Sequence, residues 1–313
     1  MTPPRTPRLT NRQASRSRVL ATGLLLASSA LSMTAVHAAA VYALAADGST
    51  LVRFDSATPG SVATVGAVSG ATTRLDGLDF RPANGLLYGY SSTTSGIYTV
   101  NPATGATALV ATSSAPVGAA TLGIDFNPVP DRLRVVTDAG DNRRINLAGG
   151  AAVTDGALAY AAGDVNAGAT PRVADVAYTN NDNNPATGTQ LFYIDYVLNT
   201  LVTTSNPNAG ELSTVGALGV DTDENLGFDI LTSAAGVNSA FATLRVGGVQ
   251  GFYGINLATG AATLVGNLNT GALNGLAVAP VSEPAPLALV AAAGAVLLLQ
   301  RRRQRHSEAG VGC

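Results

Sequence analysis

The sequence lacks most of the side chains on which nucleophilic and metal chemistry usually depends. Its 313 residues include no Lys and no Trp, a single Cys and two His. The Cys is Cys313, the last residue, so neither a disulfide framework nor a cysteine-rich zinc site can be built. Without Lys there is no Schiff-base or P-loop lysine. Because His37 and His306 lie near the two ends, no Ser-His-Asp or Cys-His apparatus is expected between them.

Residues 1–38 are organised like a secretory signal peptide. Five Arg between Arg5 and Arg18 precede an apolar run over 19–35, and small residues follow that run. A basic region, an apolar region and a small-x-small site, in this order, are the features of a cleavable signal. Val36-His37-Ala38 fits the site, so cleavage is expected after about residue 38. A retained membrane anchor is the alternative.

Residues 281–313 carry a second address signal. The motif Ser282-Glu283-Pro284 precedes an apolar run over 285–299 and a cluster formed by Arg301, Arg302 and Arg303. This ending resembles the PEP-CTERM sorting signal of bacteria, whose tail is processed by the membrane protease exosortase. Ser282 stands where that family usually has Pro, and residues 306–313 are an additional stretch. A plain tail anchor is the alternative, and with either one the arginine cluster would stay on the inner side of the membrane, so the folded domain would face outward.

The region between the two ends is acidic. Residues 39–280 contain nine Arg against 18 Asp or Glu, so the formal net charge of this region is −9, compared with −2 for the whole chain. Nucleic acids and anionic lipids require a basic surface, so nucleic-acid binding is not expected. The expected partners are signal peptidase and an exosortase-like enzyme during export. Afterwards, at the cell surface or outside the cell, they are a polysaccharide or another surface protein.

One phrase recurs through this region at steps of 46 to 54 residues. It reads Gly-Leu-Asp-Phe at 77–80 and Gly-Ile-Asp-Phe at 123–126, and weaker copies begin at 173, 227 and 275. Short β-rich runs separated by Asn-Gly and Asn-x-x-x-Gly turns fill the intervals. A period of this length with about four strands per repeat predicts a β-propeller. A ring of six or seven blades and a β-sandwich are the alternatives.

The first repeat is incomplete, and its missing part stands at the far end of the region. It begins at Val41, which matches the second strand of a blade, while the matching first strand is found at 274–280. We therefore expect an all-β fold of five four-stranded blades, with the ring closed by the C-terminal strand. Such closure removes a free sheet edge. The predicted units are 41–68 with 274–280, 76–111, 122–155, 172–217 and 226–266.

Three segments carry a resemblance to a known family. Residues 41–66, 125–136 and 256–266 look like the bacterial domain of unknown function 4394, and the resemblance extends over nearly all of 41–280. It implies a secreted, repeat-built β domain, often paired with a sorting tail of the PEP-CTERM kind. The family brings no established activity and no catalytic residues, so the resemblance supports the fold and leaves the function open.

The aspartates of the repeated phrase are candidate metal ligands. Asp79, Asp125, Asp175 and Asp229 occupy the same position in four of the five innermost strands, and Ala277 occupies it in the fifth. Innermost strands line the axis of a propeller, so these carboxylates would converge there. They would raise one another's pKa unless a cation bound among them, and Ca²⁺ prefers oxygen ligands of this kind. The alternative is structural, with each Asp accepting backbone N–H bonds from a neighbouring loop or blade.

Three other polar or charged segments are weaker candidates. Residues 221–225 begin like an EF-hand loop, but Leu226 and Thr232 stand where that loop needs Gly and Glu. Residues 180–185, rich in Asn, are a second candidate for a calcium loop, and the favoured alternative is a solvated loop between strands. Arginines at 132, 134, 143 and 144 could bind a carboxylate or an acidic sugar, or pair with nearby acids.

These observations leave three functions open. The first is an exported, non-enzymatic propeller that binds or scaffolds in the cell envelope or extracellular matrix. The second is a glycoside hydrolase built on two carboxylates. Against it stand the lack of Trp and the position of most Tyr and Phe inside strand patterns, where core packing is the default. The third is a cation-dependent, lectin-like module.

Overall fold

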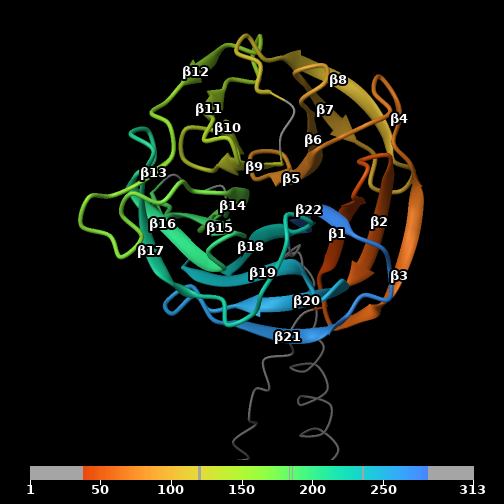
Figure 1. Cartoon of the computed structure of the whole chain (residues 1–313). Coiled ribbons are helices and arrows are strands. Elements are labelled where there is room, and N and C mark those ends of the chain that lie inside the picture. Colours follow the sequence, from red (N-terminus) through yellow and green to blue (C-terminus); the bar gives the residue numbers. More distant parts are fainter. Residues whose placement is uncertain (1–37, 119–120, 183, 185, 235, 281–313) are drawn as a thin grey trace, which may run out of the picture. The chain divides into compact units, whose positions relative to one another are not determined.

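The described part of the chain is a five-bladed β-propeller. The computed structural model describes residues 38–118, 121–182, 184, 186–234 and 236–280. The predicted signal peptide and sorting tail fall almost entirely outside these ranges. Twenty-two strands form five sheets that are arranged as blades around an axis (Figure 1). Across the described ranges, no helix has the length and hydropathy required of a membrane span. The all-β, five-bladed prediction is confirmed.

Each blade is an antiparallel meander whose strands follow one another from the axis to the outer edge. The first blade contains β22 (Leu273–Val278), β1 (Ala40–Ala45), β2 (Thr50–Asp55) and β3 (Thr58–Ala67). The second contains β5 (Gly77–Arg81), β6 (Leu86–Ser91), β7 (Gly96–Val100) and β8 (Ala106–Thr112). The third contains β9 (Leu122–Asn127), β10 (Arg132–Thr137), β11 (Asn142–Ile145) and β12 (Ala152–Thr154). The fourth contains β14 (Val173–Tyr178), β15 (Leu191–Asp195), β16 (Thr200–Asn206) and β17 (Glu211–Ala217). The fifth contains β18 (Gly227–Ala234), β19 (Val237–Val246), β20 (Val249–Ile255) and β21 (Ala262–Asn267).

The hydrophobic core is divided among the five interfaces between blades. Each of five buried clusters joins side chains from two neighbouring blades, as where Leu44 of β1 packs with Leu78 of β5. Innermost strands such as β14 are buried at every position, whereas the outer strand β21 has no buried residue. The aromatic residues assigned to the core by the sequence are buried there: Tyr88, Tyr98, Phe192, Tyr193, Phe252 and Tyr253.

Two blades have one strand more than the four that the sequence predicts. The segment β4 (Ser69–Gly70) pairs in parallel with β8, and β13 (Ala159–Tyr160) pairs in parallel with β17. Both segments belong to the linkers that enter these blades, and they lie along the outer edge of the sheet. Their amide hydrogen bonds satisfy carbonyl groups that an edge strand would otherwise expose to other chains.

Closure of the ring occurs inside the first blade, as predicted. The last strand, β22, pairs antiparallel with β1, and the register places Val41 opposite Val278. The Ala279 amide donates to the Ala40 carbonyl at 2.8 Å, and the Ala46 amide donates to the Ala272 carbonyl at 3.0 Å. The two ends of the described chain thus share one sheet (Figure 1).

Candidate functional site

The axial site is built from the innermost strands, which approach one another closely because they carry glycine. In the motif Gly-x-Asp, the Gly and the Asp lie on the same side of the strand, which faces the innermost strand of the next blade. A Cβ atom added at Gly123 would lie 2.3 Å from Asp175 Oδ1, and one added at Gly227 would lie 2.5 Å from the carbonyl carbon of Gly275. Larger residues at these positions would push the strands apart, so the glycines set the spacing of the aspartates.

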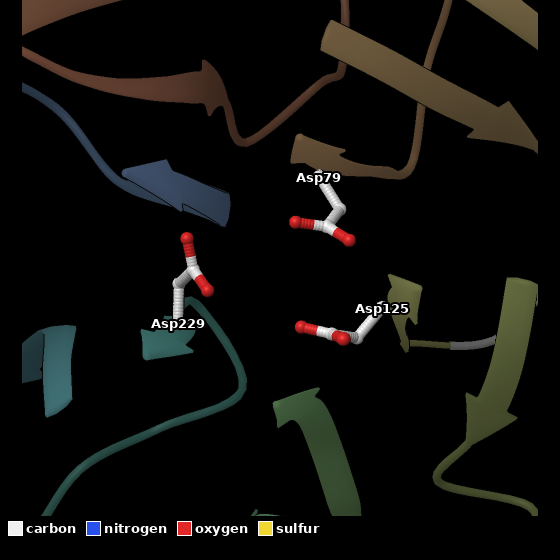
Figure 2. Close-up of side chains that lie close together, drawn as sticks. All are labelled: Asp79, Asp125 and Asp229. Atoms are coloured by element: carbon white, nitrogen blue, oxygen red, sulfur yellow. The ribbon is translucent and has the colours of Figure 1, made fainter. Parts of the chain in front are cut away.

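Three of the four predicted aspartates converge on the axis. Asp79, Asp125 and Asp229 each contribute a carboxylate oxygen to a group in which all three atoms lie within 4.8 Å of one another (Figure 2). All four aspartates are buried, with only 2 to 4% of each residue exposed. Asp175 is not a member of the three-residue group, and Ala277 leaves the fifth position of the ring without a carboxylate. This arrangement, which we call the axial carboxylate cluster, provides the hard oxygen ligands of a divalent cation.

The same aspartates also connect neighbouring blades. The Phe126 amide donates to Asp79 Oδ2 at 2.7 Å and the Phe228 amide donates to Asp175 Oδ2 at 2.8 Å. The Val278 amide donates to Asp229 Oδ2 at 2.6 Å, which joins the fifth blade to the first. In each case the donor belongs to the innermost strand of the next blade. The hydrogen bonds expected of a structural role are therefore present for Asp79, Asp175 and Asp229.

Burial has the largest effect on the pKa values of the four axial aspartates. Desolvation raises the pKa of Asp79, Asp125 and Asp175 well above the usual value, and it raises the pKa of Asp229 to about 7. Repulsion by Asp229 raises the pKa of Asp79 further, and repulsion by Asp79 does the same for Asp125. Backbone amide hydrogen bonds act in the opposite direction without cancelling these effects. Without a bound metal, the four axial aspartates therefore retain protons at neutral pH that exposed aspartates would have lost.

A small charged pocket of about 250 Å³ lies where the innermost strands begin. Its walls include Arg74, Asp76 and Glu224, which precede these strands, and Asn274 on β22. Asp76 is already engaged there, because it accepts hydrogen bonds from the Ser92 amide at 2.7 Å and from Arg74 Nε at 3.0 Å. The pocket thus opens at one end of the axis and is lined by all five blades.

The two candidate calcium loops use their carboxylates internally. Asp223 forms an ion pair with Arg245 at 2.8 Å, and Asp221 accepts a hydrogen bond from Asn199 Nδ2 at 2.9 Å. In the other loop, Asp182 accepts from the Asn184 amide at 3.0 Å. Residues 183 and 185 of that loop lie outside the described ranges.

The arginines of the third blade pair with nearby polar groups. Arg134 is 1% exposed, and it donates to the Tyr178 hydroxyl at 2.6 Å and to Asn208 Oδ1 at 3.1 Å. Asp155 lies between Arg134 and Arg144, at 3.3 Å and 2.7 Å. Of these partners, Tyr178 and Asn208 come from the fourth blade. No motif in the sequence points to them, because their positions relative to Arg134 follow from the packing of separate blades.

The fold and the axial site together define a five-bladed propeller closed by strand exchange, with a buried carboxylate layer on its axis. The chain belongs to the family described as Domain of unknown function (DUF4394), whose model matches residues 50–277. No curated protein matches the chain.

Many solved structures are similar to the chain, and three of them illustrate the low identity of these matches. One is a nidogen/laminin complex, 10% identical, with 76% of this chain and 83% of that chain covered and a TM-score of 0.43. Another is a structural genomics protein of unknown function from Bacteroides thetaiotaomicron, 13% identical, with coverages of 65% and 53% and a TM-score of 0.45. The third is a protein from Lactobacillus plantarum, 16% identical, with coverages of 76% and 71% and a TM-score of 0.38.

Proposed function

We propose that the protein is an exported, non-catalytic propeller that acts as a binding or scaffold module in the cell envelope or extracellular matrix. One observation carries the non-catalytic part: the axial carboxylates are 2 to 4% exposed, and three of them hold neighbouring blades together. A glycoside hydrolase needs two carboxylates that contact the sugar directly. The axial acids therefore fit the maintenance of the ring better than hydrolysis, and recognition is left to other surfaces of the propeller.

The part of the proposal that concerns export and sorting rests on the sequence of the two ends. A signal peptide over 1–38 would direct export and would be removed by signal peptidase. Ser282-Glu283-Pro284, the apolar run after it and the arginines Arg301 to Arg303 would hold the chain in the membrane until an exosortase-like enzyme processes the tail.

Export and sorting are tested with the full chain in a bacterium that has an exosortase. Antibodies against residues 39–280 would follow the wild type, a variant with alanine at 282–284 and a control variant with alanine at 307 and 308. We expect the wild type and the control at the cell surface or in the medium, shortened at the C-terminus. The motif variant should stay in the membrane fraction with its tail. An identical distribution of all three would refute sorting, and release of reducing ends from envelope polysaccharide by the purified wild type would refute the non-catalytic part.

A cation-dependent role is a second candidate, favoured by the 4.8 Å convergence of Asp79, Asp125 and Asp229. Ca²⁺ bound there would replace the retained protons and would stabilise the folded state, by about 2.7 kcal/mol at a hundred times its Kd. Melting curves of the purified protein in EDTA and in millimolar Ca²⁺ should then differ. Asp125→Asn should abolish the difference, whereas Asp175→Asn, outside the three-residue group, should retain it. An equal Tm for the wild type in both buffers would exclude the ion.

A further inference from the structure

A pocket between the third and fourth blades is lined by hydroxyl and amide side chains. It has a volume of about 450 Å³, and its walls include Asn127, Tyr178, Thr189, Gln190, Thr203 and Ser213. We propose that this hollow, the polar pocket, binds an uncharged polysaccharide. The proposal rests on the binding function proposed above and names the chemical class of its ligand.

The lack of charged side chains in the polar pocket selects against ionic ligands. None of its ten lining residues is charged, whereas the pocket at the axis carries Arg74, Asp76 and Glu224. A charged ligand placed in the polar pocket would lose hydration without gaining a countercharge. The net charge of −9 over residues 39–280 also repels anionic polymers from the domain as a whole. The ligand that fits is therefore neutral and rich in hydrogen-bonding groups.

The polar groups of the pocket are held in place before any ligand arrives. Arg134 Nε donates to the Tyr178 hydroxyl at 2.6 Å, and Tyr178 is 2% exposed. Gln190 Nε2 donates to Thr203 Oγ1 at 3.0 Å, and Thr203 Oγ1 donates to the Leu191 carbonyl at 2.8 Å. Hydroxyl and amide groups both donate and accept hydrogen bonds, as sugar hydroxyls do. Fixed side chains reduce the entropy lost on binding.

A second hollow adjoins the polar pocket and extends the surface toward the fifth blade. It has a volume of about 500 Å³, shares Thr189 and Gln190 with the polar pocket, and also has no charged residue in its lining. Asn180 and Asn238 contribute amides to it. Each hollow is within the size range of ligand sites in proteins, about 300 to 1,000 Å³. Two adjoining hollows suit a polymer of several sugar units better than a single monosaccharide.

The strands that line the polar pocket offer no free edge within it to which an extended peptide could add as a further strand. The lining includes Leu191, Thr203 and Ser213, which lie on β15, β16 and β17. Thr203 pairs with Ser213 and Leu191 pairs with Thr204, so the strands that meet there are already hydrogen-bonded to each other. A peptide that adds a strand to a sheet needs a free edge. Recognition through side-chain hydroxyls and amides therefore favours a polysaccharide.

The proposal is tested by calorimetric titration of the purified 39–280 protein, whose fold the structure describes as one closed ring. The probes are cellohexaose, maltohexaose, laminarihexaose and chitohexaose, all neutral, with an oligogalacturonate as the anionic probe. We expect at least one neutral hexaose to bind and the oligogalacturonate not to bind. A double variant, Thr203→Val with Gln190→Leu, should bind that hexaose at least tenfold more weakly. Thr99→Val on β7 of the second blade is the matched control and should bind like the wild type.

Three results would overturn the proposal. They are the absence of binding of any neutral hexaose at millimolar concentration, equal binding by the double variant and the wild type, and preferential binding of the anionic probe. Circular dichroism and the Tm of the double variant establish that it is folded; should it unfold, Thr189→Val alone takes its place. Failure of the proposed cell-surface function is read separately, from the distribution of the full chain between cell fractions, so the two failures are distinguishable.

Discussion

At the residue scale, opposing effects act on the pKa of each axial aspartate. A hydrogen bond to a charged group contributes about 1.5 to 3 kcal/mol, and Asp229 accepts two, from the amides of Val278 and Ile230. Desolvation and the repulsion between carboxylates favour the protonated form instead. Since Asp229 keeps a pKa of about 7 despite its two amide donors, desolvation is the larger effect.

The stability of the metal-free protein should therefore fall as the pH rises. The pKa of Asp229 is about 7 in the folded state and about 3.8 in the unfolded chain, so the folded state binds more protons between these values. Its contribution is present in full below pH 3.8 and is lost as the pH rises through about 7. Asp79, Asp125 and Asp175 have pKa values raised in the same direction. We expect the Tm in EDTA to drop by about 5–10 °C between pH 5 and pH 8.

The control for this prediction replaces the titrating group. Asp229→Asn should lower the Tm at pH 5 and should flatten the decline toward pH 8, because one ionisable carboxyl is gone. Asp47→Asn should leave the decline unchanged, since Asp47 accepts its bonds from Ser49 in a solvent-exposed turn. A Tm in EDTA that rises from pH 5 to pH 8 would show that desolvation does not dominate the layer.

The sequence located the axial aspartates but could not rank them. Their equivalence followed from the repeated phrase, and the fold places all four in innermost strands. Asp175 departs from the group beside an irregularity, since the β14–β15 register shifts between Val173 and Asp175. Val173 also stands where the other copies have Gly. The polar pocket escaped prediction altogether, because its hydroxyls come from strands that no motif connects.

At the scale of elements, the linkers that lead into the second to fifth blades all form backbone hydrogen bonds at the outer edge of the blade that they enter. Those that enter the second and fourth blades form β4 and β13 along outer edges. The linker into the third blade places the Ser114 amide 2.9 Å from the Gly150 carbonyl, and the linker into the fifth places the Leu218 carbonyl 2.9 Å from the Ala262 amide. Two-residue strands have no hydrophobic pattern, which explains why the sequence predicted four strands in every blade.

The element that closes the ring is β22. Removing it would expose Leu273, Leu276 and Val278, which are at most 2% exposed, and would withdraw the Val278 amide from Asp229. Three such side chains contribute about 5 to 9 kcal/mol on burial, comparable with the total stability of a typical domain. A chain ending at Ala272 should therefore lack a cooperative melting transition, whereas a chain ending at Pro280 should retain it. Equal melting curves would refute closure by strand exchange.

For the whole molecule, stability should depend more on where the two chain ends close the ring, inside a blade or between two blades, than on the order of the blades along the chain. The natural ends of the domain lie side by side, since Ala279 and Ala40 are hydrogen-bonded, so a short glycine linker between 280 and 39 would join them. New ends can then be opened elsewhere. In the exposed turn at Asn84 and Gly85 they would divide the second blade between β5 and β6, as the natural ends divide the first.

Two circular permutants test this dependence. Opening the chain between Asn84 and Gly85 keeps one blade shared by both ends, so separating them still breaks a ladder of backbone hydrogen bonds. Opening it between Ala115 and Pro116 leaves every blade intact, and the ends of the ring are then held by the packing between the second and third blades and by isolated polar contacts. These contacts are the Asp79 bond to Phe126, the Ser114 amide bond to the Gly150 carbonyl and the Arg81–Asp131 ion pair. Because these contacts lack a backbone ladder, we expect the second permutant to melt about 5–10 °C below the first, a loss of about 2–3 kcal/mol. Equal Tm values would mean that side-chain packing alone closes the ring and that β22 serves its own blade only.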